Sequence, residues 1–433
     1  MKQSNMTVTM TPSITGEASE WKKGALHAHT LWSDGRSLPE VAIHTYRELG
    51  YDFVCLSDHN VFQSDPQVWL TVAPEEGSWP NHLAKAEYER SRELLPDSLD
   101  EKNVAFRTFV RLKTFADLRR EFECPGKFLL VGGEEITVME QQMPDGGRRH
   151  YHLNILNLEE NFLPLFGKDG AETIRLNYEQ YRNAQQRAKH PTFLMLNHPF
   201  WPRWDIEPGD LLANPEVQHF EICNNGTDVP IPKDVCSREK FWDIVLAHRL
   251  EDGKGILYAA AGDDAHFYDP DRIHNDAGCN LAWVMVHCPD EFTADNITEA
   301  LNRGDYYPTC GVLWSMVEFD STTSTLYVKA QAEKNVNYRI EFITTKRGFN
   351  RRFTEADYPG PTDELFRRLP TYSNDIGRTV LAIDGAEGSY TMMPDDLYVR
   401  AIVISDRATT VSLEMFPETE RAWTQPYFQV KSR

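Results

Sequence analysis

The feature that most constrains the fold is a series of apolar segments, each followed directly by a histidine or an acidic residue. Segments such as "YDFVCLS", "KFLLVGG", "TFLMLN" and "ILYAAAG" suit strands that are buried on both faces of a sheet. They lead into His59, Glu135, His198 and Asp264. Functional groups at the carboxyl ends of parallel strands are typical of (β/α) barrels. We therefore expect an α/β fold that gathers these side chains at one barrel mouth.

The segment "GALHAHTLWSDG", residues 24 to 35, adds three further groups. Residues i and i+2 of a strand share a face, so His27 and His29 project together as a chelating pair. Asp34 follows five residues later. Imidazole and carboxylate ligands suit Zn, Mn or Fe, and the absence of cysteine from the set argues against a structural zinc site.

Five ordered segments, "HAHTLWSDG", "LSDHN", "GGEEIT", "NHP" and "GDDAH", resemble the motifs of the PHP (polymerase and histidinol phosphatase) superfamily over roughly residues 24 to 285. The resemblance implies a distorted, TIM-like seven-stranded (β/α) barrel with two or three divalent metal ions. It also implies hydrolysis, most often of phosphoesters. The overall layout, including the tail ending "AWTQPYFQV", most resembles the CehA/McbA-like branch, which includes carbamate hydrolysis.

The same resemblance implies a set of nine metal ligands. They are His27, His29, Asp34, His59, Glu135, His152, His198, Asp264 and His266. His27, His29, Glu135 and Asp264 would hold a first ion, with Glu135 bridging to a second ion completed by His152 and His198. Asp34, His59 and His266 would hold a third.

Three of these positions have a neighbouring rival. The family pattern falls on Glu135 and not on Glu134, and it selects Asp264 over Asp263. His150 and His152 would face the same side of a strand, so spacing does not separate them. The apolar continuation "LNIL" favours His152.

A hydroxide activated by the metals would attack an ester centre, with His59 or His266 in protonated form helping the leaving group. Asp58 is a candidate for orienting His59, or equally a strand-end cap. The candidates for gripping a phosphate are Arg148, Arg149 and Arg203, and Trp201 and Trp204 are candidates for an apolar wall of the substrate pocket. Asn224 and Asn225 are possible polar contacts.

Three functions compete. The favoured one is a phosphoesterase acting on a small phosphorylated molecule. The second is hydrolysis of a carboxylic or carbamic ester at the same metal centre. The aromatic stretch "HPFWPRW" favours it. The third, a metal-binding module without activity, is disfavoured because the ligand set is complete. The formal charge of −21 argues against general nucleic-acid binding.

The pattern of polar and apolar residues divides the chain into three parts. Residues 1–22 form a polar tail without the apolar core of a secretory signal, so we expect a cytoplasmic protein that does not bind membranes. Residues 23–305 form the barrel, with an insertion at 60–127 that contains charged helical pieces and serves as a lid or as padding. Residues 306–433 show short alternating runs that predict a small antiparallel β-sandwich-like domain. Ser37 and Glu40 have the spacing of a capping box before a helix.

Overall fold

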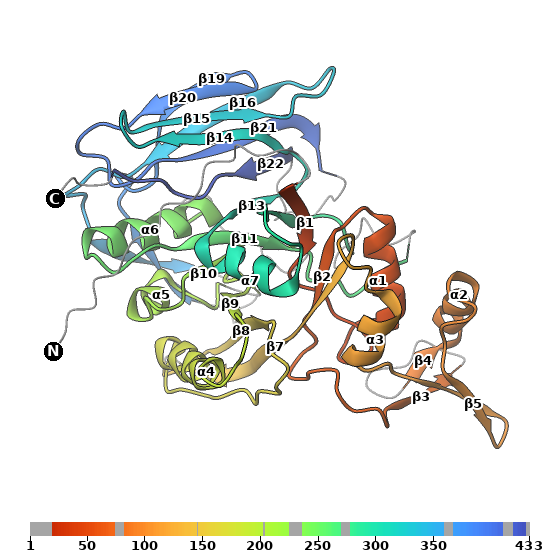
Figure 1. The fold of residues 1–433 in the computed structure, drawn as a ribbon. Helices are drawn as coiled ribbons and strands as arrows, with labels where there is room; N and C mark the ends of the chain where they lie inside the picture. The colour runs from red at the N-terminus through yellow and green to blue at the C-terminus, as the bar shows by residue number, and fades with distance from the viewer. Residues whose placement is uncertain are drawn as a thin grey trace.

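The computed structural model describes residues 20–73, 82–144, 146–201, 204–224, 236–269, 278–358, 367–409 and 419–429. Within these ranges the largest sheet has thirteen strands, in the order β11-β10-β9-β8-β7-β2-β1-β12-β13-β22-β21-β16-β19 (Figure 1). Its strands are β1 (Trp21–Ala25), β2 (Phe53–Leu56), β7 (Leu129–Gln142), β8 (Arg148–Leu156), β9 (Phe193–Leu196), β10 (His219–Asn224), β11 (Tyr258–Gly262), β12 (Trp283–His287), β13 (Tyr306–Thr309), β16 (Tyr338–Thr344), β19 (Arg378–Asp384), β21 (Arg400–Ala408) and β22 (Thr419–Trp423). The fold is therefore mixed α/β.

The strands that precede the candidate ligands run mostly in parallel. β1, β2 and β7 form one parallel set, and β9, β10 and β11 form another. β8 lies between the two sets and is antiparallel to both neighbours. A parallel bridge between Ala28 and Ala265 joins the segments that follow β1 and β11. A closed seven-stranded barrel stays a prediction.

The helices lie mainly outside the parallel strands. They are α1 (Pro39–Glu48), α2 (Lys85–Leu94), α3 (Phe115–Phe122), α4 (Gly170–Gln185), α5 (Pro208–Ala213), α6 (Arg238–Glu251) and α7 (Ala294–Arg303). The expected capping box before α1 does not form, because Leu38 is the N-cap and its side chain makes no cap hydrogen bond. Glu40 is instead fully buried in the first turn.

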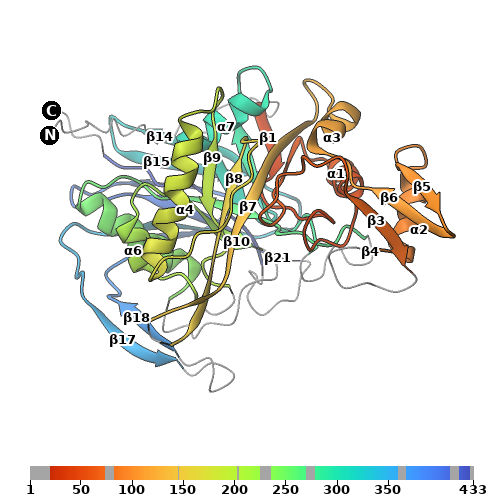
Figure 2. The same cartoon turned by 90° about the horizontal axis from the view of Figure 1, so that it is seen from below.

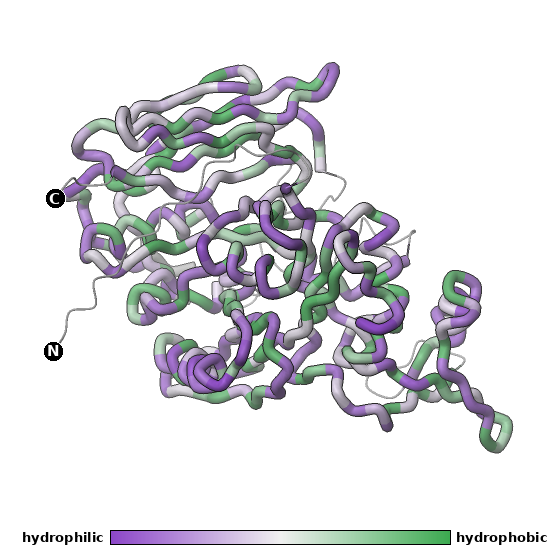
Figure 3. Tube along the Cα trace, in the orientation of Figure 1, coloured by the Kyte–Doolittle hydropathy of each residue, from purple (hydrophilic) through white to green (hydrophobic). Residues whose placement is uncertain are grey.

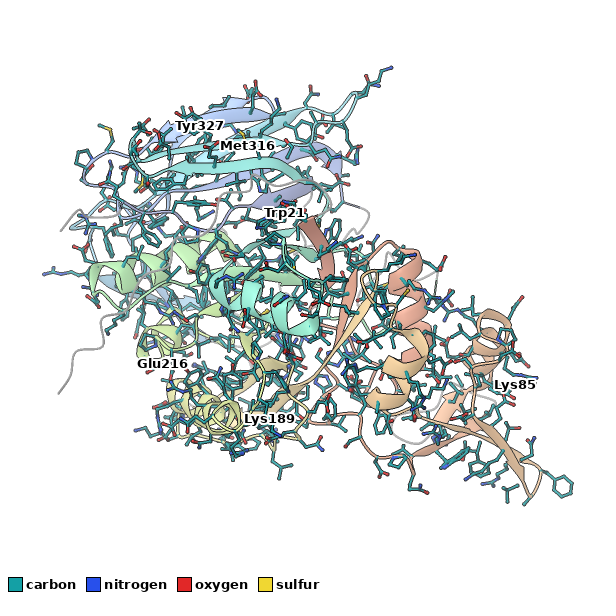
Figure 4. All side chains as sticks on the ribbon, in the orientation of Figure 1. Trp21, Lys85, Lys189, Glu216, Met316 and Tyr327 are labelled. Carbon is teal, nitrogen blue, oxygen red and sulfur yellow. The ribbon has the colours of Figure 1, made fainter. Side chains whose placement is uncertain are left out.

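The insertion at 60–127 contains more strand than the sequence indicated. It forms a sheet in the order β4-β3-β6-β5, followed by α3. These strands are β3 (Trp69–Ala73), β4 (His82–Ala84), β5 (Glu101–Val104) and β6 (Arg107–Arg111). The sheet and α2 project from the rest of the molecule in both views (Figures 1 and 2), and Lys85 marks the start of α2 in Figure 4. The segment is thus a small α/β extension.

The C-terminal part is rich in β-structure, as expected. A second sheet, in the order β14-β15-β20, lies over the end of the large sheet. Its strands are β14 (Trp314–Asp320), β15 (Thr325–Ala330) and β20 (Glu387–Thr391), and β17 (Phe353–Tyr358) pairs separately with β18 (Arg367–Tyr372). An apolar cluster that includes Val317, Leu326 and Ile340 fills the space between the layers. Tyr327 and Met316, which alternate with these buried residues, lie in the upper layer (Figure 4).

The boundary expected at residue 305 does not coincide with a break in the sheet. β12 pairs with β13 across that position, and β13 pairs with β22. Trp21, at the start of β1, packs against the apolar cluster of the C-terminal part (Figure 4). Hydrophobic residues concentrate along the strands, and the tip of the β5–β6 hairpin in the extension is also hydrophobic, with Val104 and Phe106 exposed (Figure 3). The domain limits themselves stay a prediction.

No helix in the described part of the chain combines the length and the apolar character needed to cross a membrane.

Candidate metal centre

The nine residues expected to hold metal ions all lie together in the structure. His27 and His29 follow β1, His59 follows β2, His198 follows β9, and Asp264 and His266 follow β11. Glu135 and His152 lie within β7 and β8, and Asp34 lies in the turn after His29. Among the described residues they form four overlapping groups that could hold a metal ion, with ligand atoms within 4.8 Å of one another in each group. The groups are His29, Asp34, His59 and His266; His27, Glu135 and His198; His27, His29 and Asp264; and His59, Glu135 and His152.

Glu135 is the centre of this cluster. Its Oε1 lies 3.3 Å from His27 Nε2, 3.2 Å from His152 Nδ1 and 3.4 Å from His198 Nε2. Its Oε2 lies 2.5 Å from His59 Nδ1. The carboxylate is fully buried, so both oxygens face imidazole nitrogens instead of water. Glu135 would therefore be a ligand of any divalent cation that these histidines hold.

Asp264 completes the corner formed by the two histidines after β1. Asp264 Oδ1 lies 3.2 Å from His27 Nε2 and 3.0 Å from His29 Nε2, and these two nitrogens are 3.1 Å apart. The backbone of Asp264 has a φ of 51°, which is uncommon outside glycine and asparagine. The backbone N–H of His29 donates to Ala265 O at 2.9 Å, so this corner is fixed by main-chain pairing next to the ligands.

Asp34, His59 and His266 form the part of the cluster that reaches solvent. Asp34 Oδ1 lies 3.4 Å from His59 Nε2 and 3.2 Å from His266 Nε2. The side chains of Asp34, His59 and His266 are 47%, 23% and 18% exposed, whereas those of the other six residues are buried. A substrate therefore has access to the cluster from the Asp34 side.

The histidines of the cluster fall into two sets by pKa. Burial lowers the pKa of His27, His59, His198 and His266, but the carboxylates beside them outweigh it and raise each pKa above 6.5, so a cation that binds these rings displaces protons. Burial lowers the pKa of His29 to about 3 and that of His152 to about 4, so both rings are neutral at pH 7. Burial would raise the pKa of Glu135, but His152, His59 and His27 outweigh it and hold that pKa well below 4.5. Neutral imidazoles and ionised carboxylates are the ligating forms of these groups. The donor set therefore fits divalent cations of the Zn, Mn or Fe type.

The structure separates each ligand candidate from its rival. His150 Nδ1 lies 2.8 Å from Asp205 and its Nε2 lies 3.2 Å from Glu140, outside the four groups. Asp263 accepts hydrogen bonds from the backbone N–H groups of residues 280, 281 and 282 and from the Tyr46 hydroxyl. It therefore anchors the chain before β12 and does not face the cluster.

Glu134 also points away from the candidate ligands. It accepts a hydrogen bond from Phe162 N at 2.8 Å, and burial raises its pKa to about 8. Its neighbour Glu135 faces the histidines because successive residues of a strand alternate between the two faces. The interpretation that selected Glu135 from the pair matches this geometry.

Glu221 is a residue of the site that the sequence did not predict. This fully buried residue of β10 places Oε1 3.2 Å from His27 Nδ1, and its Oε2 accepts hydrogen bonds from His198 N at 3.0 Å and from Asn224 Nδ2 at 2.8 Å. Asn197, also unpredicted, donates to Glu135 Oε1 at 2.6 Å. Such contacts orient ligands and fix their tautomers. The available signal was a single carboxylate within the apolar run "HFEIC".

Asp58 fixes the loop that carries the ligands after β1. It accepts hydrogen bonds from Thr30 N, Thr30 Oγ1, Gln63 Nε2 and Ser33 Oγ at 2.7 to 2.9 Å. Ser33 Oγ in turn lies 3.4 Å from His29 Nδ1. Asp58 thus reaches the cluster through Ser33 and positions His29, instead of orienting the adjacent His59.

Of the polar residues predicted to contact substrate, two are already engaged in ion pairs. Arg148 and Arg149 form ion pairs with Glu140 and Glu207 at 3.1 and 3.2 Å, and Arg203 and Asn225 lie outside the described residues. Asn224 contacts Glu221 and Asp264.

The two tryptophans predicted to line the substrate pocket lie in different surroundings. The ring of Trp201 lies 5.2 Å from His152 and 5.5 Å from His198, so it borders the cluster. Trp204 is buried against Phe200 and Phe241 in the core, because its backbone turns with a φ of 62° after Trp201. Trp204 is therefore a core residue and not a pocket wall.

A cavity of about 150 Å³ adjoins the exposed side of the cluster. Asp34 and Arg36 line it from the loop after β1, and Glu87 and Arg90 line it from α2 of the extension. Arg36 N donates to His266 O at 2.9 Å, which holds this loop beside the cluster. The Arg36 side chain is exposed, and no ion pair of Arg36 occurs among the described residues. The extension therefore contributes to the surroundings of the candidate site.

No protein family matches the sequence, and no curated protein matches it significantly. One similar solved structure is a two-domain protein from Bacteroides vulgatus that contains a predicted PHP-like metal-dependent phosphoesterase, with 13% identity, 94% of each chain covered and a TM-score of 0.36. Another, from Bifidobacterium adolescentis, is also predicted to be a metal-dependent phosphoesterase, with 14% identity, 65% of this chain and 96% of the other covered, and a TM-score of 0.29. At these scores the overlap is loose, and the assignment of function rests on the site itself.

Proposed function

We propose that this protein is a metal-dependent hydrolase of the PHP superfamily, of the CehA/McbA-like branch and with its barrel, and that it acts on a small phosphorylated molecule. The observation that carries the proposal is the convergence of nine histidine and carboxylate side chains from separate strands into four overlapping groups. Bound divalent ions supply Lewis acidity toward an ester oxygen and lower the pKa of water. We expect zinc or manganese in a cytoplasmic enzyme.

The residues of the chain have distinct tasks in this proposal. Glu135 and Asp264 remain ionised and balance the charge of the cations. Glu221 holds the proton on His27 Nδ1, which leaves the Nε2 lone pair directed at Glu135 and Asp264. His59 and His266 lie on the accessible side, and we propose that either of them, when it binds no ion, donates a proton to the leaving group.

Arg36 is the cation that we propose for the phosphate. It lines the cavity beside Asp34 and, unlike Arg148 and Arg149, forms no ion pair in the described structure. A guanidinium offers paired N–H donors that match phosphate oxygens. This replaces the inserted-loop arginines as the first candidates for phosphate binding.

A second candidate function is hydrolysis of a carboxylic or carbamic ester. It is favoured by Trp201, whose partly exposed ring lies beside His150, His152 and His198 and offers an apolar surface at the cluster. An aryl or alkyl ester group would pack there.

The test is turnover of a matched aryl series by the manganese-loaded protein: a phosphomonoester, a phosphodiester, a carboxylic ester and a carbamate. Loss of turnover after chelation and in Asp264→Asn shows that the cluster is responsible. Turnover of the phosphorylated members alone supports the phosphoesterase. Turnover of only the other two would replace it with the ester or carbamate hydrolase, and no turnover of any member would contradict both.

A further inference from the structure

A second cavity lies between α6 and the C-terminal end of the large sheet. It has a volume of about 470 Å³, and its lining includes none of the nine candidate ligands. One wall is the first part of α6, and the other wall comes from β16, β19, β21 and β22 (Figure 1). The cavity is therefore lined both by the part of the chain that carries the candidate metal centre and by the β-rich part.

Each carboxylate that lines this cavity already has an arginine partner. Asp243 accepts from Arg400 Nε at 2.8 Å and from Arg400 Nη2 at 2.6 Å. Glu239 lies 3.6 Å from Arg421, and Glu341 lies 2.9 Å from an arginine outside the lining, Arg339. The negative charges of the walls are thus balanced within the protein.

Positive groups remain after this balance. Arg378 is exposed on β19, and no ion pair of Arg378 occurs in the described structure. Lys240 donates to the backbone carbonyls of Ser373 and Ile376 at 2.7 and 2.5 Å, neither of which carries a countercharge. The cavity therefore has an excess of positive charge in a protein whose formal charge is −21.

Arg400 gives an independent sign of a missing partner. It is 1% exposed, it lines the cavity, and within the described chain its Nη1 has no hydrogen-bond partner although Nε and Nη2 are paired. A buried guanidinium N–H without an acceptor is costly. An anion in the cavity would supply the acceptor.

The first turn of α6 adds to the same preference. α6 has fourteen residues, Ser237 caps it by accepting from Lys240 N at 3.1 Å, and both residues line the cavity. The N-terminus of a helix of this length carries a partial positive charge that favours anions.

We infer that this cavity binds a small ligand with at least two negative charges on phosphate or carboxylate oxygens, held by Arg378, Lys240 and the free N–H of Arg400. Such a ligand would contact α6 and the β-rich part together. The inference does not depend on the proposed hydrolytic function, because none of the candidate metal ligands takes part in it.

The test is calorimetric titration of metal-free, full-length protein with pyrophosphate, and in parallel with malonate to distinguish phosphate from dicarboxylate ligands. We expect saturable binding of at least one probe below millimolar concentration. Arg378→Ala should weaken it at least tenfold, because a charge-assisted contact is lost. Glu341→Gln should tighten it, because a negative wall charge is removed.

Arg407→Ala is the matched control, since Arg407 is an exposed arginine of the same strand as Arg400 but lies outside the cavity lining. Its affinity should equal that of the unmodified chain. The inference is overturned if neither probe binds at millimolar concentration, or if Arg378→Ala and the double variant Arg378→Ala/Lys240→Met bind as tightly as the control. Melting curves establish that each variant is folded.

Discussion

Replacing Glu221 by glutamine is expected to weaken metal binding by changing the tautomer of His27. Glu221 Oε2 already accepts two hydrogen bonds, from His198 N and Asn224, so the glutamine oxygen would take that position. The amide NH₂ would then face His27 Nδ1, which the carboxylate contacts at 3.2 Å. To accept from that NH₂, Nδ1 must lose its proton, and the proton moves to Nε2. His27 would then present N–H instead of a lone pair to the cluster.

The expected loss of metal affinity follows from the loss of the hydrogen bond that orients one ligand, His27. Removing the hydrogen-bond partner of a metal-ligating histidine typically costs 10- to 100-fold in metal affinity or activity, which is about 1.4 to 2.8 kcal/mol. The assay is competition for Zn²⁺ or Mn²⁺ with a chromophoric chelator at pH 7.5, followed by activity of the metal-saturated variant. Saturation should restore part of the activity, because the remaining ligands are intact.

Glu134→Gln is a matched control for this experiment. It also exchanges a buried carboxyl for an amide, but Glu134 contacts Phe162 N and not the cluster, and its pKa of about 8 leaves it neutral at pH 7. Its metal affinity should be unchanged. If Glu221→Gln binds metal within twofold of Glu134→Gln, the assigned role of Glu221 is wrong.

Further outcomes follow from other residues. Burial raises the pKa of Glu40 from 4.5 to about 7, so the folded chain keeps a proton there that the unfolded chain loses above pH 4.5. Stability therefore falls as pH rises from 4.5 to 7, by about 3 kcal/mol at 1.36 kcal/mol per pH unit, and Glu40→Gln should stabilise the protein at pH 8 but hardly at pH 5 in urea denaturation. Arg36→Ala should raise KM for a phosphorylated substrate about tenfold with little change in kcat, while Arg47→Ala should change neither. Asp264→Ala and His59→Ala should each lower the metal content measured by mass spectrometry. Chelation should lower the melting temperature of the unmodified protein, because a ligand that binds only the folded state stabilises it.

Much of the site could be predicted because its spacing follows strand geometry. His27 and His29 are two residues apart and share a face, and Glu135 and Glu134 are adjacent and face opposite sides. In each case the backbone period alone restricts the direction of the side chain. The choice within each acidic pair, Glu135 over Glu134 and Asp264 over Asp263, came from the family motif. The structure shows the reason for the second choice in the backbone N–H groups that Asp263 binds.

Other features depend on contacts between distant segments and leave little trace in the sequence. The direction of β8 is set by a long hairpin with β7, and an apolar run reads the same in either direction. Glu221 supports two histidines from strands far apart in the chain, and a single acid in an apolar strand does not reveal such partners. The direction of Trp204 depends on one residue with positive φ, and the burial of Glu40 depends on packing that overrides its capping pattern.

The continuity of the large sheet has a consequence for how this protein can be divided. A chain cut at residue 305 would lose β13 and leave unpaired the backbone groups of β12 that face it, while the other edge of β12 stays paired with β1. It would also uncover Trp21, which the β-rich part covers. An open sheet edge beside exposed aromatic surface is a template for self-association. Expression of the chain up to residue 305 by itself should therefore give aggregates, because the whole sheet is needed to cover its own edge and core.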